Sequence, residues 1–320
     1  MNELILELPL IGNVNIIISN DEIAKFTARQ FKNYIKEFNI ISCNVKFNSL
    51  IKVQNKKIIK NFEDLSKDFL QLGRNYLFDK CKITLSNIDY FINNDTLNIT
   101  TGLKQKIKWY KKYKKINYSK QHSGFYDYIL YPIFSLYTLL DGYYLLHGSL
   151  LRLKEKNILL SGIDGVGKSS LCNFLCKEGG EILSDNFVLF NGQNSIPFKI
   201  AMRIDPNQET SLNTIFKNNE LKEVLPPLLN DDNSKIILDK IYILTIGSNF
   251  KINSFNTSIA NLILFLNLAP EINIVNQKIS PLLYANFKKN KYFKDNLKIT
   301  CLEIPKGQLK EGVKEILNDY

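Results

Sequence analysis

The first hundred residues alternate between apolar and polar positions in a pattern that predicts short strands. Glu3–Leu8 and Asn13–Ser19 are the first two, and Pro9 ends the first because proline cannot donate to a strand ladder. Asn20 is a candidate N-cap for a helix that we expect to run to about Phe38. Further strands are expected at Ile40–Phe47, Lys82–Leu85, and in a hairpin of Tyr90–Asn93 and Thr96–Thr100 around Asn94-Asp95. This pattern predicts a small α+β domain, in which we find no chemical motif.

The second part of the chain has longer apolar runs. Tyr126–Tyr144 predicts a helix whose end Gly142 weakens, and Leu145–Leu153 and Asn157–Ser161 predict two strands that lead into a glycine-rich turn. Further strands are expected at Ile241–Ile246 and Leu297–Ile304, and helices near Ser258–Leu268 and Gly307–Leu317. Helices that alternate with strands in this way predict a mixed α/β domain.

Length and composition exclude wholesale disorder. Of the 320 residues, 45% are apolar and 23% are charged, which is enough to bury a core. The net charge is +11, but only four of the 42 basic residues are arginine, the residue that phosphate and base recognition favour. We therefore interpret the positive charge mainly as a compositional bias toward Lys, Asn and Ile, and we do not expect nucleic acid as a partner.

The cysteines and the apolar stretches favour a soluble, cytoplasmic protein. The five cysteines are scattered and do not form a disulfide framework, and Cys172 and Cys176 are expected to be packing residues rather than a zinc site. Glu3 and the absence of a basic n-region argue against a signal peptide. The most apolar charge-free stretches are shorter than a membrane-spanning helix, so no membrane partner is expected.

A lysine-rich segment lies between the two parts. Residues 104–120 contain eight lysines and no acid, interleaved with Trp109 and three tyrosines. In order of preference, the segment is a solvated face or linker, a docking surface for an acidic protein or peptide, or a surface that stacks on a nucleic-acid strand. His122, beside it, is expected to be structural.

The clearest chemical motif is a phosphate loop. From Gly162 to Ser169 the chain matches G-x-x-x-x-G-K-[ST], between an apolar strand and an amphipathic helix. The glycines let backbone N–H groups point inward, and the helix that begins at Lys168 adds its positive N-terminal end. We therefore expect ATP and Mg²⁺ as cofactors, with Lys168 on the phosphates and Ser169 on the metal. The expected nucleotide-binding residues are Gly162, Asp164, Gly165, Val166, Gly167, Lys168, Ser169 and Ser170.

The segment after the loop helix supplies a carboxylate. We expect the helix to end at Gly179-Gly180 and a strand at Glu181–Phe190, with Asp185 at its middle and 17 residues after Lys168. Asp185 can be the base that accepts the proton of a substrate hydroxyl, a metal ligand, or a structural acid; we prefer the first role. The chain lacks the N-K-x-D sequence of GTPases and the L-S-G-G-Q sequence of transporter ATPases. Only Arg203 follows the loop, whereas a nucleoside-monophosphate kinase needs several arginines.

Three segments together resemble the catalytic domain of HPr kinase/phosphorylase and its relatives, serine kinases with a phosphoenolpyruvate-carboxykinase-like fold. They are residues 146–150 (LHGSL), 162–170 and 183–186 (LSDN), with His147 15 residues before Gly162 and Asp185 23 residues after it. The resemblance covers roughly Leu145 to Arg203. It implies an α/β fold, namely a mixed-sheet phosphate-loop domain of the HPr kinase C-terminal type, preceded by a smaller α+β domain.

The resemblance also implies catalytic roles. Asp185, like the first of the family's paired aspartates, would direct the metal and accept the hydroxyl proton. His147 would lie close to the transferred phosphoryl, and Arg203 would match a cation downstream of the acidic strand. The second aspartate is Asn186 here, which removes a carboxylate and argues against the reverse, phosphorylase-type reaction. The long signature that follows the acidic strand in HPr kinases is absent, which points to a relative with another substrate.

We therefore expect an ATP- and Mg²⁺-dependent kinase that transfers the γ-phosphoryl to a hydroxyl, foremost serine, of a peptide or protein, such as a precursor peptide of acidic character. A kinase of a small molecule such as free serine, and a module that only senses ATP, remain alternatives. The expected division is an N-terminal α+β domain at 1–103 that recognises the substrate, a connection at 104–125, and the kinase domain at 126–320. A homo-oligomer is compatible with the sequence.

Overall fold

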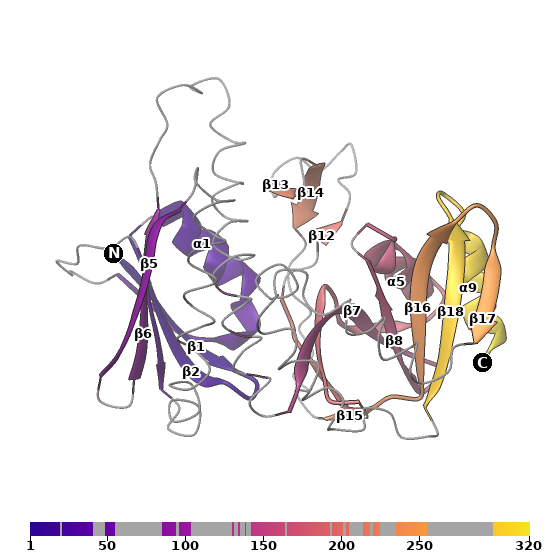
Figure 1. Cartoon of the computed structure of the whole chain (residues 1–320), viewed down its shortest axis with the longest axis horizontal. Coiled ribbons are helices and arrows are strands. Elements are labelled where there is room, and N and C mark those ends of the chain that lie inside the picture. Colours follow the sequence, from indigo (N-terminus) through magenta and orange to yellow (C-terminus); the bar gives the residue numbers. More distant parts are fainter. Residues whose placement is uncertain are drawn as a thin grey trace.

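The computed structural model describes residues 1–19, 21–40, 49–54, 85–93, 96–103, 130, 134, 138, 142–163, 165–192, 194–200, 203–204, 214–217, 220–224, 235–254 and 297–320. These residues form two sheets, of six and nine strands, and a small sheet of three strands. Figure 1 shows how the sheets and helices are arranged. Within these ranges, no helix has the length and apolar character needed to cross a lipid bilayer.

The N-terminal sheet is antiparallel throughout, with strand order β3-β1-β2-β4-β6-β5. Alternate residues of β1, Leu4, Leu6 and Leu8, are buried because side chains of a strand alternate between its two faces. The helix α1 (Asp21–Gln30) packs against β1 and β2 and buries Ile23 and Ala24. The strands are β1 (Asn2–Leu8), β2 (Gly12–Ile18), β3 (Ile35–Ile40), β4 (Ser49–Gln54), β5 (Leu85–Asn93) and β6 (Thr96–Leu103).

The predicted helix from Asn20 to Phe38 is wrong in its second half. The helix ends at Gln30, the short 3-10 helix η1 (Lys32–Tyr34) follows, and the chain then enters β3. The strand β3 pairs with β1 across nearly forty residues of chain, for example Ile40 with Asn2. This non-local pairing overrides the local pattern that predicted a helix to Phe38. The predicted hairpin is confirmed, since β5 and β6 pair directly from Asn93 and Thr96 outward.

The nine-stranded sheet is mixed and contains the phosphate loop. Its order is β15-β11-β10-β7-β8-β16-β18-β17, and β9 also pairs with β7. The strands β8, β16 and β18 are parallel, whereas the other pairs are antiparallel. This arrangement agrees with the predicted α/β class and its mixed sheet. The strands are β7 (Tyr144–Leu153), β8 (Lys156–Gly162), β9 (Glu181–Ser184), β10 (Phe187–Phe190), β11 (Asn194–Pro197), β15 (Ile236–Ile237), β16 (Lys240–Gly247), β17 (Lys251–Ser254) and β18 (Lys298–Pro305).

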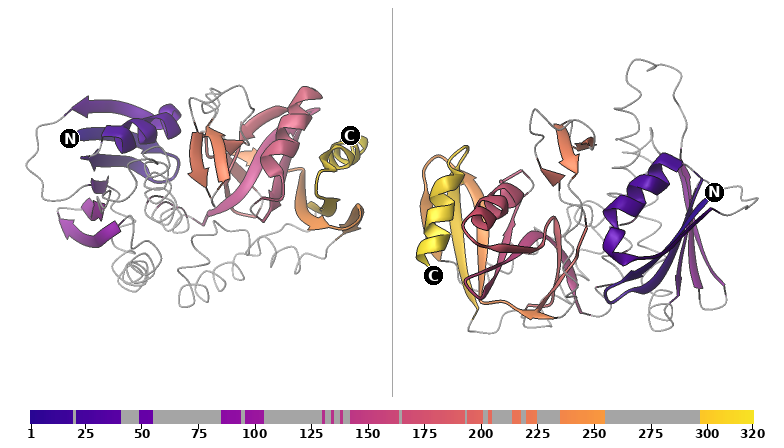
Figure 2. Two further views of the ribbon diagram at one scale, coloured as in Figure 1. Left: turned by 90° about the horizontal axis from the view of Figure 1, so that it is seen from above. Right: turned by 180° about the vertical axis from the view of Figure 1, so that it is seen from behind.

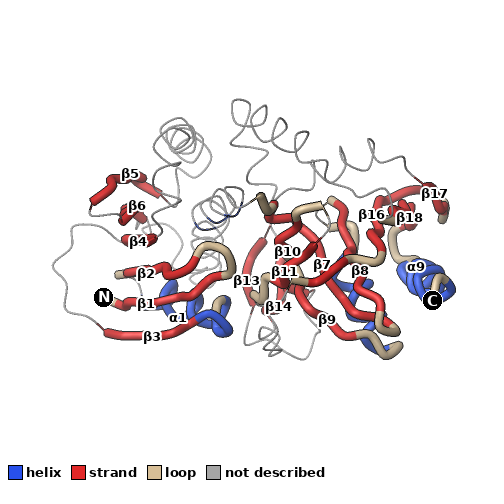
Figure 3. Tube along the Cα trace, turned by 90° about the horizontal axis from the view of Figure 1, so that it is seen from below, coloured by secondary structure: helices blue, strands red, loops and turns tan. Residues whose placement is uncertain are grey.

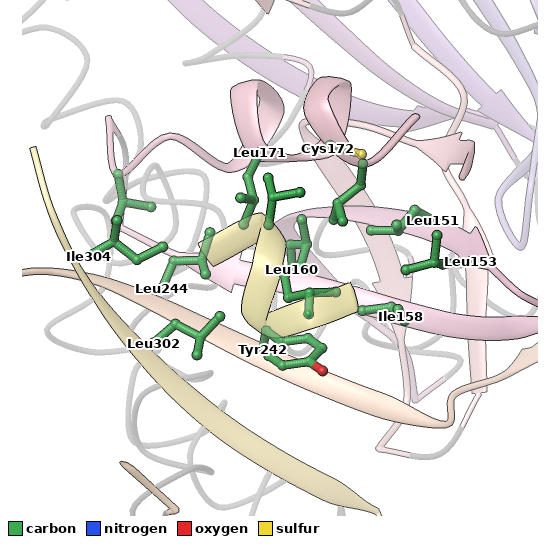
Figure 4. Close-up of a cluster of buried hydrophobic side chains, with 14 residues drawn as sticks. Leu151, Leu153, Ile158, Leu160, Leu171, Cys172, Tyr242, Leu244, Leu302 and Ile304 are labelled. Atoms are coloured by element: carbon green, nitrogen blue, oxygen red, sulfur yellow. The ribbon is translucent and has the colours of Figure 1, made fainter. Parts of the chain in front are cut away.

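Two helices, α5 (Lys168–Lys177) and α9 (Leu309–Asn318), pack against each other and against this sheet (Figure 2). Figure 4 shows the core between them and β7, β8, β16 and β18, which includes the fully buried side chains of Leu160, Leu171 and Tyr242. Cys172 belongs to this core, which confirms its predicted role as a packing residue.

Several predictions for this part of the chain are confirmed. The strands expected near residues 145, 157, 241 and 297 are β7, β8, β16 and β18, and the last expected helix is α9. The predicted helix at Tyr126–Tyr144 ends before Tyr144, which begins β7; most of that segment, like Ser258–Leu268 and the lysine-rich residues 104–125, lies outside the described residues. The small sheet has order β12-β14-β13 and consists of β12 (Arg203–Ile204), β13 (Thr214–Lys217) and β14 (Glu220–Val224).

An aromatic cluster joins the N-terminal sheet to the nine-stranded sheet. The rings of Tyr34 and Phe198 are stacked with centroids 5.7 Å apart, and Phe31 and Phe134 pack edge-on around them. The Tyr34 hydroxyl accepts a hydrogen bond from the Lys199 backbone N–H at 2.6 Å and donates to the Pro197 carbonyl at 3.5 Å. All four rings are buried, so this contact is a continuation of the protein core.

Candidate functional site

The phosphate loop connects β8 to α5, and its shape depends on glycine at defined positions. A Cβ atom at Gly162 would lie 2.5 Å from the Leu244 carbonyl oxygen of β16, so no larger residue fits there. Gly167 is the residue before α5 and has a φ of 97°, in the left-handed region. Its carbonyl accepts the hydrogen bond from the Leu171 N–H at 2.8 Å that begins the helix. The first N–H groups of α5 therefore face the loop, an arrangement that is suited to an anion.

The ammonium group of Lys168 lies over this loop. It donates hydrogen bonds to the carbonyls of Gly162 and Ile163, both at 2.8 Å, and the residue is only 5% exposed. Its positive charge is thus held against the carbonyls at the start of the loop. Val166 is buried in the core below, so its side chain anchors the loop, while Ser170 continues α5; Asp164 lies outside the described residues.

Asp185 lies in a break between two strands. The prediction of one strand from Glu181 to Phe190 is wrong, since β9 ends at Ser184 and β10 begins at Phe187. Both strands pair with the same edge of β7, and Asn186 between them has a φ of 74°, a conformation that asparagine tolerates better than most residues. The break allows the side chain of Asp185 to turn toward the loop helix instead of following the alternation of a strand.

The carboxylate of Asp185 is buried among hydroxyl groups. Its Oδ1 atom accepts hydrogen bonds from the Ser149 hydroxyl of β7 and, at 3.1 Å, from the Ser169 hydroxyl of α5. Its Oδ2 atom is buried and has no hydrogen-bond partner among the described residues, and the residue is 1% exposed. Burial raises the pKa of Asp185 above its ordinary value, although the bonds from Ser149 and Ser169 and the charge of Lys168 act in the opposite direction.

His147 lies on β7, two residues before the serine that bonds to this carboxylate. It is 5% exposed, pairs in register with Phe187 of β10, and precedes Ser149 by two residues, so the two side chains share one face of the strand. Its ring lies 6.0 Å from that of Phe187. The structure therefore brings Lys168 to the loop and the Ser169 hydroxyl to Asp185, with His147 on the same face of β7 as Ser149. The catalytic roles expected for these residues stay predictions.

A magnesium ion fits the oxygen atoms at this site. The unpaired carboxylate oxygen of Asp185 and the hydroxyl of Ser169 are hard ligands of the kind that Mg²⁺ prefers. In the part of the chain that the structure describes, no three His, Cys, Asp or Glu side chains gather into a metal cluster. A magnesium ion held here would therefore keep waters and phosphate oxygens among its ligands, as it does in kinases.

Arg203 lies in the small three-stranded sheet, whereas the other candidate residues lie in or beside the nine-stranded sheet. It is in β12 of the small sheet, paired in register with Val224, and β12 packs against α5. Its side chain lies outside the described part of the structure, so its predicted role on the phosphates stays a prediction.

Two residues of the site were missed by the sequence reasoning. Ser149 donates to Asp185, and the signal for it was its position two residues after His147 in a strand. The Ser184 hydroxyl accepts from the Phe198 N–H at 3.0 Å and lies 2.6 Å from the Phe187 carbonyl, so it clamps the break that carries Asp185. The Phe187 carbonyl is a local partner, whereas the bond from Phe198 depends on the tertiary fold, so no sequence pattern marks Ser184.

Comparisons with known proteins leave the family of this chain open. No protein-family profile and no curated protein matches the sequence. A search of solved structures finds similarity to a structure described as the Hpr(Ser) kinase/phosphatase from Coxiella burnetii, with 10% sequence identity and a TM-score of 0.26. The match covers 55% of this chain and 94% of that one. At this TM-score the likeness carries no argument, and the case for a function rests on the geometry of the site.

Proposed function

We propose that this protein is an ATP- and Mg²⁺-dependent kinase, related to HPr kinase in its phosphate-loop domain, that phosphorylates a serine hydroxyl of a peptide or protein. The observation that carries the proposal is the buried carboxylate of Asp185, which touches the loop serine Ser169 and keeps one oxygen without a partner among the described residues. The local resemblance from His147 through the loop to Asp185 supports the family part of the proposal.

The proposed reaction uses Asp185 as a base. The oxygen of the acceptor hydroxyl attacks the terminal phosphorus, a new P–O bond forms, and the bond from that phosphorus to the departing diphosphate breaks. The hydroxyl proton goes to the Oδ2 atom of Asp185, while Ser149 and Ser169 hold the Oδ1 atom. A raised pKa favours this step, because a more basic carboxylate accepts the proton more readily.

The remaining residues bind and orient. The loop N–H groups and Lys168 hold the phosphates, which compensates the charge of the transferred group. A bound magnesium ion, held by the Ser169 hydroxyl and by Asp185 through one of the waters of the ion, would leave Oδ2 available for the proton and would supply further charge neutralisation on the phosphates. In this proposal His147, on the same face of β7 as Ser149, donates a hydrogen bond to the transferred phosphoryl, a role that its position in the strand supports.

The test compares Asp185→Asn and Lys168→Ala with the wild type. We expect Asp185→Asn to bind ATP but to lower phosphate transfer to serine peptides by roughly a thousandfold, the effect of losing a general base. Lys168→Ala should lose both binding and transfer. Binding is measured with a fluorescent ATP analogue and transfer with γ-labelled ATP. Asp239→Asn is the matched control, because Asp239 binds Lys156 and the Asn157 backbone in another part of the sheet.

Each other outcome has a distinct meaning. Equal phosphate transfer by the wild type and Asp185→Asn would refute the role of Asp185 as the base. Transfer to free serine but to no peptide would identify a small-molecule kinase. Binding of ATP by a wild type that phosphorylates neither acceptor would identify an ATP-sensing module instead.

A further inference from the structure

The outer strand of the N-terminal sheet, β3, has an edge that can accept another strand. Figure 3 shows β3 at the margin of the sheet, where it pairs with β1 and, among the described strands, with no other. The outward N–H and C=O groups of an edge strand are a ready template for an extended peptide. Two large apolar side chains lie on this strand, Phe38 at 43% and Ile40 at 86% exposure, and their spacing puts them on one face.

A groove begins where β3 begins. Its volume is about 840 Å³, and it is lined by Ile35 and Lys36 of β3, by Tyr34, by the turn between β1 and β2, and by Ile196 and Lys235 next to the second sheet. The groove therefore continues the edge of β3 toward the sheet that carries the phosphate loop.

The groove lies a short distance from the proposed catalytic carboxylate. Ile196 of β11 precedes Phe198 by two residues, and the Phe198 N–H donates to the hydroxyl of Ser184, the residue before Asp185. At about 3.3 Å per extended residue, this path is roughly 15 Å long. About five residues of an extended peptide would span that distance.

The charges of the groove favour an acidic occupant. Of its two lysines, Lys36 forms an ion pair with Glu7. Lys235 is exposed, and in the described part of the chain no acid pairs with it. One positive charge is thus available to an acidic side chain that enters the groove.

We propose that the outer edge of β3 and this groove bind an extended, acidic segment of the phosphoryl acceptor as an added β-strand. The proposal rests on the proposed function, because it takes the acceptor to be a peptide. Backbone hydrogen bonds to β3 provide affinity, Phe38 and Ile40 contact apolar side chains of the segment, and Lys235 selects an acid. The acceptor serine lies about five residues from the part of the segment that enters the groove.

The test uses the full chain and synthetic peptides that carry one serine among glutamate and apolar residues, with lysine in place of glutamate in a control set. Hydrogen exchange is measured without nucleotide, and we expect the amides of β3 to exchange at least about tenfold more slowly when the acidic peptides bind. Ile40→Asp and Lys235→Glu should each weaken binding about tenfold, and Lys235→Glu should shift the preference toward the lysine peptides. Matched controls are Ile252→Asp and Lys251→Glu on β17, which is an edge strand of the other sheet.

Several results would overturn the docking proposal. One is that peptides bind without slower exchange of the β3 amides, and another is that no peptide binds. A third is that β3 becomes protected when the protein concentration alone is raised, which would assign this edge to a second copy of the chain. If the wild type, Ile40→Asp and Lys235→Glu phosphorylate the peptides at equal rates, the docking proposal is refuted while the proposed kinase function still holds. Peptides that bind at β3 but are never phosphorylated with Mg²⁺ and ATP would instead refute the proposed function alone.

Discussion

At the scale of single residues, the site depends on a carboxylate that the fold buries at a cost. Asp185 is 1% exposed, and its Oδ2 atom has no partner in the described part of the molecule. A buried charge without full pairing lowers the stability of the folded state. Such residues concentrate at functional sites, where a ligand supplies the missing partner. The same carboxylate should therefore be unfavourable for stability and essential for the reaction.

This trade-off predicts the effect of Asp185→Asn on folding. Without nucleotide and magnesium, the variant should be about 1–2 kcal/mol more stable than the wild type, because the neutral amide is cheaper to bury. With both ligands present, the wild type should gain stability that the variant does not fully gain. Thermal unfolding with and without Mg²⁺-ATP measures both effects. A variant that unfolds at a lower temperature than the wild type in the absence of ligands would contradict this explanation.

Ser149 is a positioning residue in the same site, since it acts through Asp185. Ser149→Ala removes one of the two bonds that hold Oδ1, so kcat should fall about tenfold to a hundredfold while ATP affinity is unchanged. The pKa of Asp185 should rise further, which would move the acidic limb of the rate profile to higher pH. The control is Ser195→Ala, because the Ser195 hydroxyl is also buried but has no partner among the described residues. A changed ATP affinity without a changed pH profile would argue for a merely structural role.

At the scale of elements, one glycine precedes α5 in the loop and another follows the helix, and both have the same kind of backbone conformation. Gly165 in the loop and Gly179 after α5 both have positive φ angles, 79° and 94°, and neither has an atom within 4 Å of the place where a Cβ would lie. An alanine is therefore strained by the backbone at both positions and by contacts at neither. The two glycines form a matched pair for separating backbone strain from function.

We expect Gly165→Ala and Gly179→Ala to lower the free energy of unfolding by similar amounts, about 1 kcal/mol each. Only Gly165→Ala should weaken ATP binding, by at least about tenfold, because it disturbs the loop whose N–H groups we propose to hold the phosphates. Urea unfolding and nucleotide titration measure the two quantities. Equal loss of ATP affinity in both variants would show that strain, not loop geometry, is responsible.

The helix α9 is held to the sheet by a polar contact at its C-terminal end. Asp319 accepts hydrogen bonds from the Lys240 ammonium and the Tyr242 hydroxyl of β16. Burial acts to raise the pKa of Asp319, but these bonds outweigh it and lower the pKa below its ordinary value. At the other end of α9, Leu309 lies against Gly167, since a Cβ there would be 3.0 Å from its side chain. The contact at Asp319 thus helps to hold the helix that borders the loop.

This contact predicts a loss of stability in acid. A carboxyl whose pKa is lower in the folded state stabilises the protein above its unfolded pKa of about 3.9, and that contribution is lost as the pH falls through the folded value. Asp319→Asn should cost about 1 kcal/mol at neutral pH, a modest amount because solvent screens the partly exposed pair. The difference from the wild type should shrink between neutral pH and a pH below the lowered folded-state pKa of Asp319. Urea unfolding at both pH values tests this, with Glu155→Gln in an exposed turn as the control.

At the scale of the whole molecule, a few residues connect the N-terminal sheet to the site. Tyr34 bonds to the backbone at Pro197 and Lys199, which flank Phe198, and Phe198 in turn bonds to Ser184 next to Asp185. The proposed peptide edge and the proposed catalytic carboxylate are therefore linked through one continuous set of packed and bonded groups. This link is a set of contacts in space, and mutation can show whether the two sites are energetically coupled through it.

Tyr34→Phe tests the link with little change in packing. The ring can still stack on Phe198, but the buried N–H of Lys199 loses its acceptor, so the free energy of unfolding should fall by about 1–2 kcal/mol. Hydrogen exchange should quicken around Ser184 and Asp185 as well as in η1. Urea unfolding and exchange of the same sample measure the two effects. Faster exchange in η1 alone would show that the two sheets are not coupled through this contact.

Much of the site was predictable from the sequence because its parts are local. The loop glycines, Lys168 and the first turn of α5 are consecutive, so the motif alone specifies how they meet. The strands β7, β8, β16 and β18 followed from apolar runs for the same reason. The break at Asp185 was not predictable, because it arises from the way that two short strands pair with β7 around a left-handed Asn186.

The sequence by itself determined the residues on which the proposed chemistry depends, namely a phosphate-loop motif followed by a nearby acid, since both are residue types at short spacing. Only the tertiary structure decided that Ser149 holds Asp185, that residues 35–40 form an edge strand instead of the end of a helix, and that a groove joins that edge to the second sheet. These features depend on contacts between residues far apart in the chain. Such contacts form only when burial of the whole core compensates the entropy of ordering the chain, and no local pattern encodes that balance.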